Sequence, residues 1–341
     1  MNKVNDLVIP FKHRMFAHCE SGTVAGLLNH AGLEISEPMV FGISSGILFA
    51  YYKPPALPFP MIVVRNFPGQ MMRGVSRRLG VKFKTARYKN QARGEQAIDA
   101  LLDKGIPVAC RVDFFYMDYL PPYMRAHFNF HFLTIVGRKG SKFLVSDCYS
   151  TELAELERDS LRKGRYPGGS FDPKGFLFYP VRVPTDPDID RAIKKGIRAA
   201  CFNMLRLPVP FLGIRGIRLF SKKIMDWPGM ARNDDHLSHE VMKINILLED
   251  QGTGGAGYRF MYATFLRQAS ERLGRPELKE MSERMMLVGD DWRRISIHAA
   301  RMGKNRDFAE EKFRELSGKI SRQADAEELF FTDLAKIART L

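Results

Sequence analysis

The sequence predicts an α+β domain with an antiparallel sheet, followed by a mainly α-helical domain. Three observations support this class. Helical patterns come first along the chain, runs of β-forming residues around turn signals follow them, and long helical patterns fill the region after residue 182. The chain has 341 residues, of which 45% are hydrophobic and 11% aromatic, so it can bury the cores of two modest domains. That composition excludes a disordered chain.

Periodicity and turn residues place the elements of the first half. The first helix covers SGTVAGLLNHAG and ends at Gly32, because glycine is a common residue just past a helix. Turn residues at Arg138-Lys139-Gly140 separate two β-forming runs that can pair as a hairpin. The other expected elements are a strand at MIVVRNF, a helix and a strand on either side of Gly80, a helix at RGEQAIDALLDKG, and strands at IPVACRVDFF and GGSFDPKGFLFYPVRV.

The second half consists of long amphipathic helical patterns. They cover residues 189–207, 236–249, 258–273, 277–302 and 309–340. Asp186, or the prolines Pro184 and Pro187, would begin the first of these helices. We therefore expect two domains, 1–182 and 183–341, with the boundary near residue 182.

The chain is strongly basic. It carries 53 lysines and arginines against 38 acidic residues, a formal charge of +15, and its pI is about 9.7. This excess favours an acidic partner, which is a nucleic acid, an anionic membrane surface or an acidic protein. Because no RNA-binding aromatic signature or helix-turn-helix pattern is present, we expect no nucleic acid partner.

The apolar stretch 207–220 is the nearest thing to a membrane segment. Prolines and arginines interrupt it, which excludes a membrane-spanning helix. It could make a peripheral membrane contact or line an acyl pocket, but a segment that contacts the core is the simpler interpretation.

Four cysteines are spread along the chain: Cys19, Cys110, Cys148 and Cys201. They form no CxxC pair, so neither a disulfide scaffold nor a metal site is indicated, and a reducing compartment is expected. The N-terminal MNKVNDLVIPFKHR lacks the apolar run of a signal peptide, which predicts a cytoplasmic location. Cys110 and Cys148 lie in or at the end of predicted strands, and we interpret both as structural.

Three residues stand in an order that suggests nucleophilic catalysis. Cys19 lies at a helix start, where the helix dipole and free N–H groups favour a thiolate. His131 begins the strand HFLTIVG and Asp147 ends the next one, KFLVSD, so a hairpin would place them side by side. A base that is oriented by a carboxylate and reaches a thiol is the arrangement of papain-like cysteine enzymes. Each residue alone has a structural explanation, but the three together favour a catalytic site.

Three neighbours of Cys19 are further candidates. His13 lies six residues before it, where papain-like enzymes place a glutamine of the oxyanion hole, and an imidazole could donate the same hydrogen bond. His18 could line the site or hold the loop. Glu20 lies in the first helical turn, where a carboxylate stabilises the helix dipole, but it could also receive a cationic amine substrate.

Parts of the chain resemble a known family. The segment FKHRMFAHCESGTVAGLLNHAGLEISEPMVFGISSGILFAY is similar to the N-terminal domain of the acyltransferase of butirosin biosynthesis. The later FHFLTIVGRKGSKFLVSD is similar to the strands that carry the His and Asp of this family. LEDQGTGGAGYRFMYATFLRQAS resembles the helical domain that usually follows. The matching positions are His13, His18, Cys19, Gly32, Ser36, Glu37, Phe41, Gly42, Gly46, Phe49 and Tyr51.

The resemblance implies an acyltransferase with a papain-like fold. In it, an acyl group moves from a thioester on the phosphopantetheine arm of an acyl carrier protein to an amine or hydroxyl of a small-molecule acceptor. Cys19 would be the nucleophile, His131 the base and Asp147 the residue that orients it, and no bound cofactor is implied. The helical domain would complete the cleft or the acyl or acceptor pocket, and such a domain often mediates homodimers.

Carrier proteins are acidic, which agrees with the basic composition. The residues that could contact a carrier are Arg73, Arg77, Arg78 and Lys82, or Lys194, Lys195 and Arg198.

The glycine-rich segment 252–257 has two interpretations. It could hold an anion on free N–H groups with the help of Arg259, or it could be a turn between helices in which Thr253 begins the second helix. We therefore keep Thr253 and Arg259 as substrate-binding candidates. Two functions remain as alternatives to acyl transfer: a cysteine hydrolase (peptidase, amidase or thioesterase) with the same site, and a non-catalytic basic binding protein.

Overall fold

The computed structural model describes residues 6–54 and 58–341, which form two compact units. The first unit contains the chain up to Val40 and Met71–Pro187, and the second contains Phe41–Gln70 and Asp188–Leu341. The sequence placed a single boundary near residue 182. The structure differs in one respect, because the segment 41–70 packs with the helices of the second unit.

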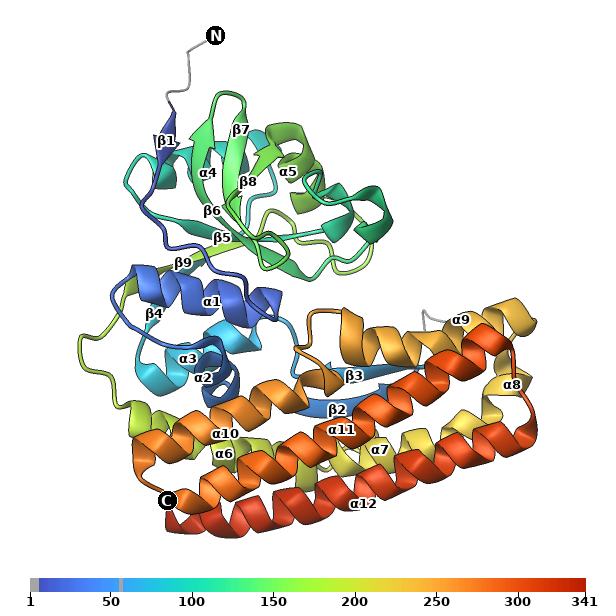
Figure 1. Ribbon diagram of the computed structural model, residues 1–341. Helices are drawn as coiled ribbons and strands as arrows, with labels where there is room; N and C mark the ends of the chain where they lie inside the picture. Colours follow the sequence, from blue (N-terminus) through green and yellow to red (C-terminus); the bar gives the residue numbers. More distant parts are fainter. Residues whose placement is uncertain (1–5, 55–57) are drawn as a thin grey trace. The chain divides into compact units, whose positions relative to one another are not determined.

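An antiparallel sheet forms the centre of the first unit (Figure 1). Its strands lie in the order β4-β9-β5-β6-β7-β8, and β1 pairs with β6. The strands are β1 (Leu7–Val8), β4 (Lys82–Ala86), β5 (Val108–Val112), β6 (His131–Lys139), β7 (Lys142–Ser146), β8 (Ala154–Glu157) and β9 (Leu177–Arg182). The helices of this unit are α1 (Cys19–His30), the start of α2 (Glu37–Ile43), α3 (Gln70–Leu79), α4 (Gln91–Leu102) and α5 (Arg158–Arg165).

The alternation of side chains along β6 and β7 builds two layers on the sheet. Leu133 of β6 and Val145 of β7 belong to a buried core that α4 and α5 complete. Thr134 and Ser146, which are partners across the two strands, line a hollow against α1 instead. Successive strand residues point to opposite faces, so α1 lies on one face of the sheet and α4 and α5 lie on the other. The α+β class with an antiparallel sheet is therefore confirmed.

Glycines allow the segment before α1 to pack closely on that helix. A Cβ atom on Gly22 would lie 2.4 Å from Phe16 Cβ, and one on Gly26 would lie 3.1 Å from Phe11 Cζ. The helix ends at His30, and Gly32 follows with a φ of +89°, as the sequence predicted. The close packing holds the chain immediately before Cys19 against the helix that Cys19 begins.

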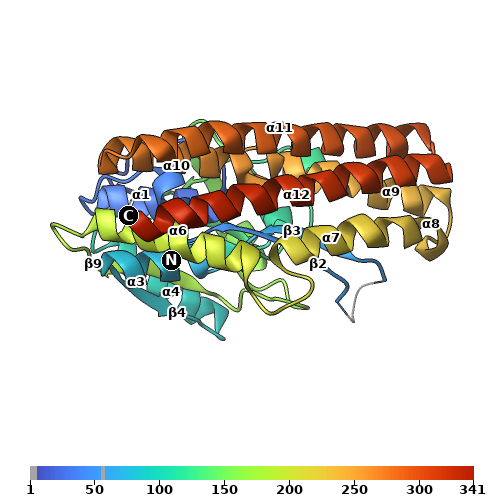
Figure 2. The same cartoon turned by 90° about the horizontal axis from the view of Figure 1, so that it is seen from below.

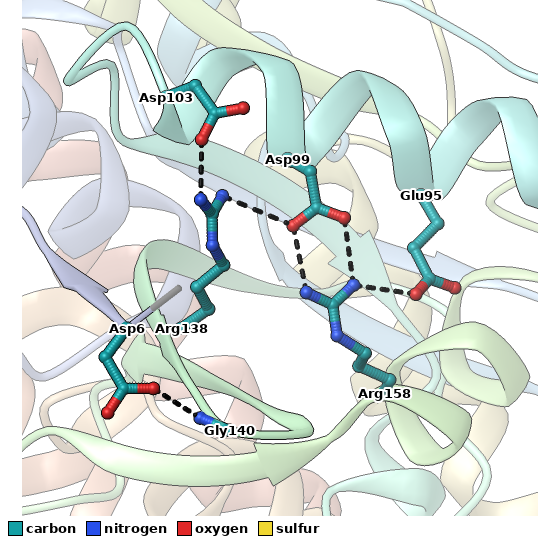
Figure 3. Close-up of polar contacts among 7 residues, drawn as sticks. All are labelled: Asp6, Glu95, Asp99, Asp103, Arg138, Gly140 and Arg158. Carbon is teal, nitrogen blue, oxygen red and sulfur yellow. Dashed lines mark hydrogen bonds and ion pairs between the residues drawn. The ribbon is translucent and has the colours of Figure 1, made fainter. Parts of the chain in front are cut away.

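Charged residues of α4 are matched by arginines from β6 and α5 (Figure 3). Arg138 donates to Asp103 at 2.6 Å, and Arg158 donates to both oxygens of Asp99 at 2.9 Å and to Glu95 at 2.7 Å. The three carboxylates are four residues apart, so they lie on one face of the helix. On this side of the sheet, positive and negative charges therefore neutralise each other.

The second unit is mainly helical, as predicted, with one hairpin of β2 (Ile47–Tyr52) and β3 (Met61–Arg65). The long helices α11 and α12 pack together and lie side by side in both views (Figures 1 and 2). The helices from Asp188 onwards are α6 (Ile189–Leu205), α7 (Gly213–Lys223), α8 (Trp227–Met230), α9 (Asp234–Asn245), α10 (Arg259–Leu273), α11 (Pro276–Asn305) and α12 (Glu310–Thr340).

One detail of this unit differs from the predictions, and another agrees with them. The side chain of Asp188 caps α6, because it accepts the N–H of Arg191, whereas the sequence suggested Asp186 or the flanking prolines. The apolar stretch 207–220 contains most of α7, whose Ile217 and Phe220 are buried. α7 packs on β2 and α12, so the stretch is a core segment. Among the helices of the described residues, none combines the length and the apolarity needed to cross a lipid bilayer.

Candidate active site

One buried carboxylate holds the loop that leads into α1. Cys19 is the first residue of the helix, and Glu37, at the start of α2, binds the residues around it. Glu37 accepts the backbone N–H of Ala17 at 2.8 Å, that of His18 at 2.9 Å and the hydroxyl of Ser21 at 2.9 Å. Burial raises the pKa of Glu37, and these three hydrogen bonds oppose that shift. Glu37 therefore fixes the backbone position of Cys19.

His131 and Asp147 lie at the same end of the sheet. β6 begins at His131, and Asp147 directly follows β7, which runs antiparallel to β6. Their side chains meet, with 2.5 Å between His131 Nε2 and Asp147 Oδ2. Both residues are 2% exposed. The hairpin thus brings the predicted base and the predicted carboxylate into contact away from bulk solvent.

Further groups fix the Asp147 carboxylate and the His131 ring. Tyr119 donates its hydroxyl to Asp147 Oδ2 at 2.6 Å, and the backbone N–H of Tyr149 donates to Oδ1 at 2.8 Å. The ring of Phe114 meets the His131 ring edge-on, with 4.8 Å between centroids. Burial raises the pKa of Asp147, but the charge and hydrogen bonds of its partners outweigh burial and lower it. Asp147 is therefore ionised at neutral pH.

The Cys19 thiol lies close enough to the His131 ring to help raise the pKa of that ring. Because Asp147 occupies Nε2, Nδ1 is the nitrogen that remains for the sulfur. Burial lowers the pKa of His131, but the charges and hydrogen bonds of Asp147 and Cys19 raise it to about 10. The sulfur also lies 3.9 Å from the carbonyl oxygen of Phe130. At neutral pH the ring therefore carries a proton and a positive charge beside the sulfur, as nucleophilic catalysis by cysteine requires.

A small hollow lies beside Cys19, between α1 and the strands β6 and β7. Most of its lining consists of glycines and of side chains that can donate or accept hydrogen bonds, and two phenylalanines close one side. The lining residues are Phe11, Phe16, Cys19, Gly22, Thr23, Gly26, Thr134, Ser146, Asp147 and Cys148.

Both ring nitrogens of His13 form hydrogen bonds within the protein. Its Nδ1 lies 2.7 Å from Ser146 Oγ, and its Nε2 lies 3.0 Å from the carbonyl oxygen of Ser150. A carbonyl oxygen only accepts, so Nε2 donates to Ser150, and Nδ1 is taken up by the Ser146 hydroxyl. In this arrangement His13 does not serve as the oxyanion donor that the sequence suggested, and instead it joins the segment before α1 to the end of β7.

His18 and Glu20 also support the fold around the nucleophile. His18 is the N-cap of α1, and its Nδ1 accepts the N–H of Ser21 at 3.2 Å. Glu20 is 0% exposed, and its Oε1 accepts the N–H of Met71, in the first turn of α3, at 3.0 Å. Since the Glu20 carboxylate has no exposed surface, the structure does not present it to an amine substrate. Both side chains hold helix ends.

Thr253 and Arg259 lie in the second unit and take part in its internal packing. Thr253 donates its hydroxyl to the Leu248 carbonyl at 2.7 Å and accepts the N–H of Gly255 at 3.0 Å. Arg259 is 0% exposed, and its Nε and Nη2 bind the two oxygens of Glu327 at 2.8 and 3.1 Å. Because this guanidinium is buried and neutralised, it does not offer an anion site. The substrate-binding role predicted for the glycine-rich segment is therefore replaced by a structural one.

Sequence reasoning missed two residues of the site, Tyr119 and Glu37. Glu37 belongs to the Ser-Glu pair that the family resemblance contains, so a signal for it was present. Tyr119 lies in an irregular segment between the short turns Phe114–Tyr116 and Pro122–Met124. No periodicity marks such a position, and its contact with Asp147 spans 28 residues.

Comparisons with known families agree with this geometry. Residues 18–148 match the family described as Butirosin biosynthesis protein H, N-terminal, which confirms the resemblance predicted from the sequence. Residues 159–334, more than half of the chain, match the family described as Domain of unknown function (DUF4872). The first match covers Cys19, His131 and Asp147, the three residues that the sequence predicted for the site.

Comparison with solved structures and with curated proteins does not assign a fold or a function to the chain. A solved structure described as a C39-like peptidase from Bacillus anthracis is 13% identical to the chain, covers 53% of it and is itself covered completely, with a TM-score of 0.33. A TM-score this low does not assign a fold, and the fold class rests on the sheet and helices themselves. No curated protein matches the chain.

Proposed function

The chain belongs to the family of the domain of unknown function (DUF4872), which here follows a butirosin biosynthesis protein H N-terminal domain, and we propose that it is an acyltransferase. The donor is a thioester on the phosphopantetheine arm of an acyl carrier protein. The acceptor is an amine or hydroxyl of a small molecule. One observation supports this function above the others. His131 and Asp147 form a buried pair, and the Cys19 thiol lies near the His131 ring.

The first half of the reaction moves the acyl group to the enzyme. The Cys19 sulfur attacks the thioester carbonyl carbon, and a C–S bond to Cys19 forms as a tetrahedral intermediate. The negative oxygen of that intermediate would lie near the backbone N–H of Cys19 at the start of α1. The bond to the pantetheine sulfur then breaks, and His131 gives its proton to that leaving sulfur.

The second half passes the acyl group to the acceptor. The acceptor nitrogen or oxygen attacks the carbonyl carbon of the acyl-Cys19 thioester, and His131 takes the acceptor's proton. The C–S bond to Cys19 breaks, which restores the thiolate and the protonated ring. Asp147 remains ionised throughout and holds the imidazole in the orientation that both proton transfers need.

The test is the intact mass of the protein after incubation with acyl-carrier thioesters. We expect a mass increase equal to one acyl group, absent in Cys19→Ala. A Cys19→Ala variant that consumed the thioester as fast as the unmodified protein would contradict the proposal. Addition of an amine such as an aminoglycoside should remove the adduct and produce an amide. Release of the free acid at an unchanged rate, with or without the amine, would instead assign a hydrolase.

A further inference from the structure

The segment 70–94 of the first unit has an extreme charge pattern. It carries eight lysines and arginines and no acidic residue. The segment contains α3 and β4, and β4 is an edge strand of the sheet (Figure 1). We call the exposed cations of α3, of β4 and of the loop that follows β4 the basic face: Arg73, Arg77, Lys82, Lys84, Arg87 and Lys89.

The charges of the basic face are not neutralised within the chain. Among the residues that the structure describes, no carboxylate forms an ion pair with any of its six members, and Arg87 lies over the ring of Phe176. The α4 side of the same unit is different, because Arg138 and Arg158 are matched by carboxylates there (Figure 3). An uncompensated cluster of like charges attracts a partner that supplies negative charge.

Protection of the sheet edge does not explain the whole face. Lysines on an edge strand prevent pairing with another chain, and this accounts for Lys82 and Lys84. It does not account for Arg73 and Arg77, which lie on α3 and not on a strand. Arg77 lies in the last turn of α3, where a cation stabilises the helix dipole, so Arg73 is the arginine that neither reason explains.

The basic face leads to the nucleophile. α3 begins beside it, because the N–H of Met71 binds Glu20, the residue after Cys19. Burial and, next, the charge of Arg87 lower the pKa of Arg111 of β5, whose guanidinium lies 5.6 Å from the ring centroid of Phe130. The Phe130 carbonyl is the group that faces the thiol.

We propose that the basic face is the docking surface for the acidic carrier protein, which orients the phosphopantetheine arm toward Cys19. This inference rests on the proposed function. A nucleic acid or a membrane fits the face less well, because none of the exposed large hydrophobic side chains of the described residues lies in segment 70–94. Single-stranded nucleic acids need exposed aromatic rings for stacking, and membrane surfaces need apolar side chains for insertion. A folded acidic protein needs only the charges.

The test measures binding of a fluorescent, phosphopantetheinylated acyl carrier protein of a fatty-acid synthase to Cys19→Ala protein. Two pairs of changes are made separately in this background: Lys82→Glu with Lys84→Glu, and Arg73→Glu with Arg77→Glu. We expect each pair to weaken binding by about tenfold or more at low salt, because the attraction becomes repulsion. The matched control is Lys104→Glu with Lys222→Glu, two exposed lysines outside the face, which should change affinity less than twofold.

Several results would overturn the proposal. One is carrier binding that neither pair of changes weakens, and another is an equal weakening by the control pair. A third is a DNA duplex or an anionic phosphatidylglycerol vesicle that binds more tightly than the carrier, if the same pairs of changes abolish that binding. Adduct formation on Cys19 from an N-acetylcysteamine thioester, measured with Cys19 restored, separates this inference from the proposed function. If no thioester labels the unmodified protein, the function is wrong. If Cys19 is labelled as expected but the Lys→Glu and Arg→Glu pairs leave carrier binding unchanged, only the docking surface is wrong.

Discussion

The two units each contain a buried pair of opposite charges, and the pairs differ in what surrounds them. In the second unit, Arg259 and Glu327 bind each other through two hydrogen bonds, and Trp292 donates a third to Glu327 at 2.5 Å. In the first unit, His131 binds Asp147 through Nε2 only, and its other side faces the Cys19 thiol. Arg259 and Glu327 use their hydrogen bonds on each other and on Trp292, whereas protonated His131 can offer its remaining N–H to the Cys19 sulfur.

The contrast between the two pairs shows how a buried charge with a structural role can be distinguished from one with a catalytic role. Burial alone does not do so, because all four side chains are hidden from solvent. The distinguishing feature is a titratable group that is oriented on one side and still available on the other. By this criterion the proposed catalytic pair is His131–Asp147 and the structural pair is Arg259–Glu327, and the following experiments test that distinction.

The largest effect is expected from His131→Gln. The change removes the proton donor and acceptor of both half-reactions, so the rate of acyl transfer should fall by about 10²–10⁴-fold. The initial rate with a carrier thioester, measured beside the unfolding midpoint, checks this. Glu327→Gln is the control, and its transfer rate per folded molecule should be close to that of the unmodified protein. Equal losses of activity in the two variants would erase the distinction.

Arg259→Met should act on stability instead. It leaves Glu327 as a buried charge without its partner, which costs about 3–5 kcal/mol in the free energy of unfolding. Replacement of both residues, by Arg259→Met with Glu327→Leu, should recover most of that loss, since no charge is then buried. Urea unfolding of the three proteins measures this. A single variant as stable as the unmodified protein would show that the pair is not structural.

Tyr119→Phe should have an intermediate effect. It removes one hydrogen bond to the ionised Asp147, and hydrogen bonds to charged groups contribute about 1.5–3 kcal/mol. Because this bond is one of the causes that lower the pKa of Asp147, its loss should raise that pKa and move the acidic limb of the kcat/KM profile to higher pH. A variant with lower stability but an unshifted acidic limb would give Tyr119 a packing role only.

The last effect concerns stability at alkaline pH. The pKa of His131 rises from 6.5 to about 10 on folding, so its contribution to stability is complete below pH 6.5 and is lost as the pH rises toward 10. The unmodified protein should therefore lose more stability than His131→Gln between neutral pH and pH 10. Unfolding curves of both proteins across this range test the sign, and parallel losses would contradict it.

The sequence predicted those parts of the site that depend on local patterns. A helix start placed Cys19, and one hairpin placed His131 and Asp147, because both signals lie within short stretches of chain. The sequence left the role of Arg259 open, since its partner Glu327 lies 68 residues away and no pattern connects them. For the same reason the packing of segment 41–70 in the second unit was not predicted. The helix pattern of the second half was predicted well, except for the short α7 and α8.

The central claim is that Cys19 is the activated nucleophile, and site-resolved alkylation by iodoacetamide at neutral pH tests it most directly. The chain provides its own controls. Burial raises the pKa of Cys110, Cys148 and Cys201, and Cys148 is more exposed than Cys19. We predict that Cys19 reacts fastest of the four in spite of its burial, and that His131→Gln removes this advantage. If Cys19 reacts no faster than Cys148, or if His131→Gln leaves its alkylation rate unchanged, Cys19 is not an activated nucleophile.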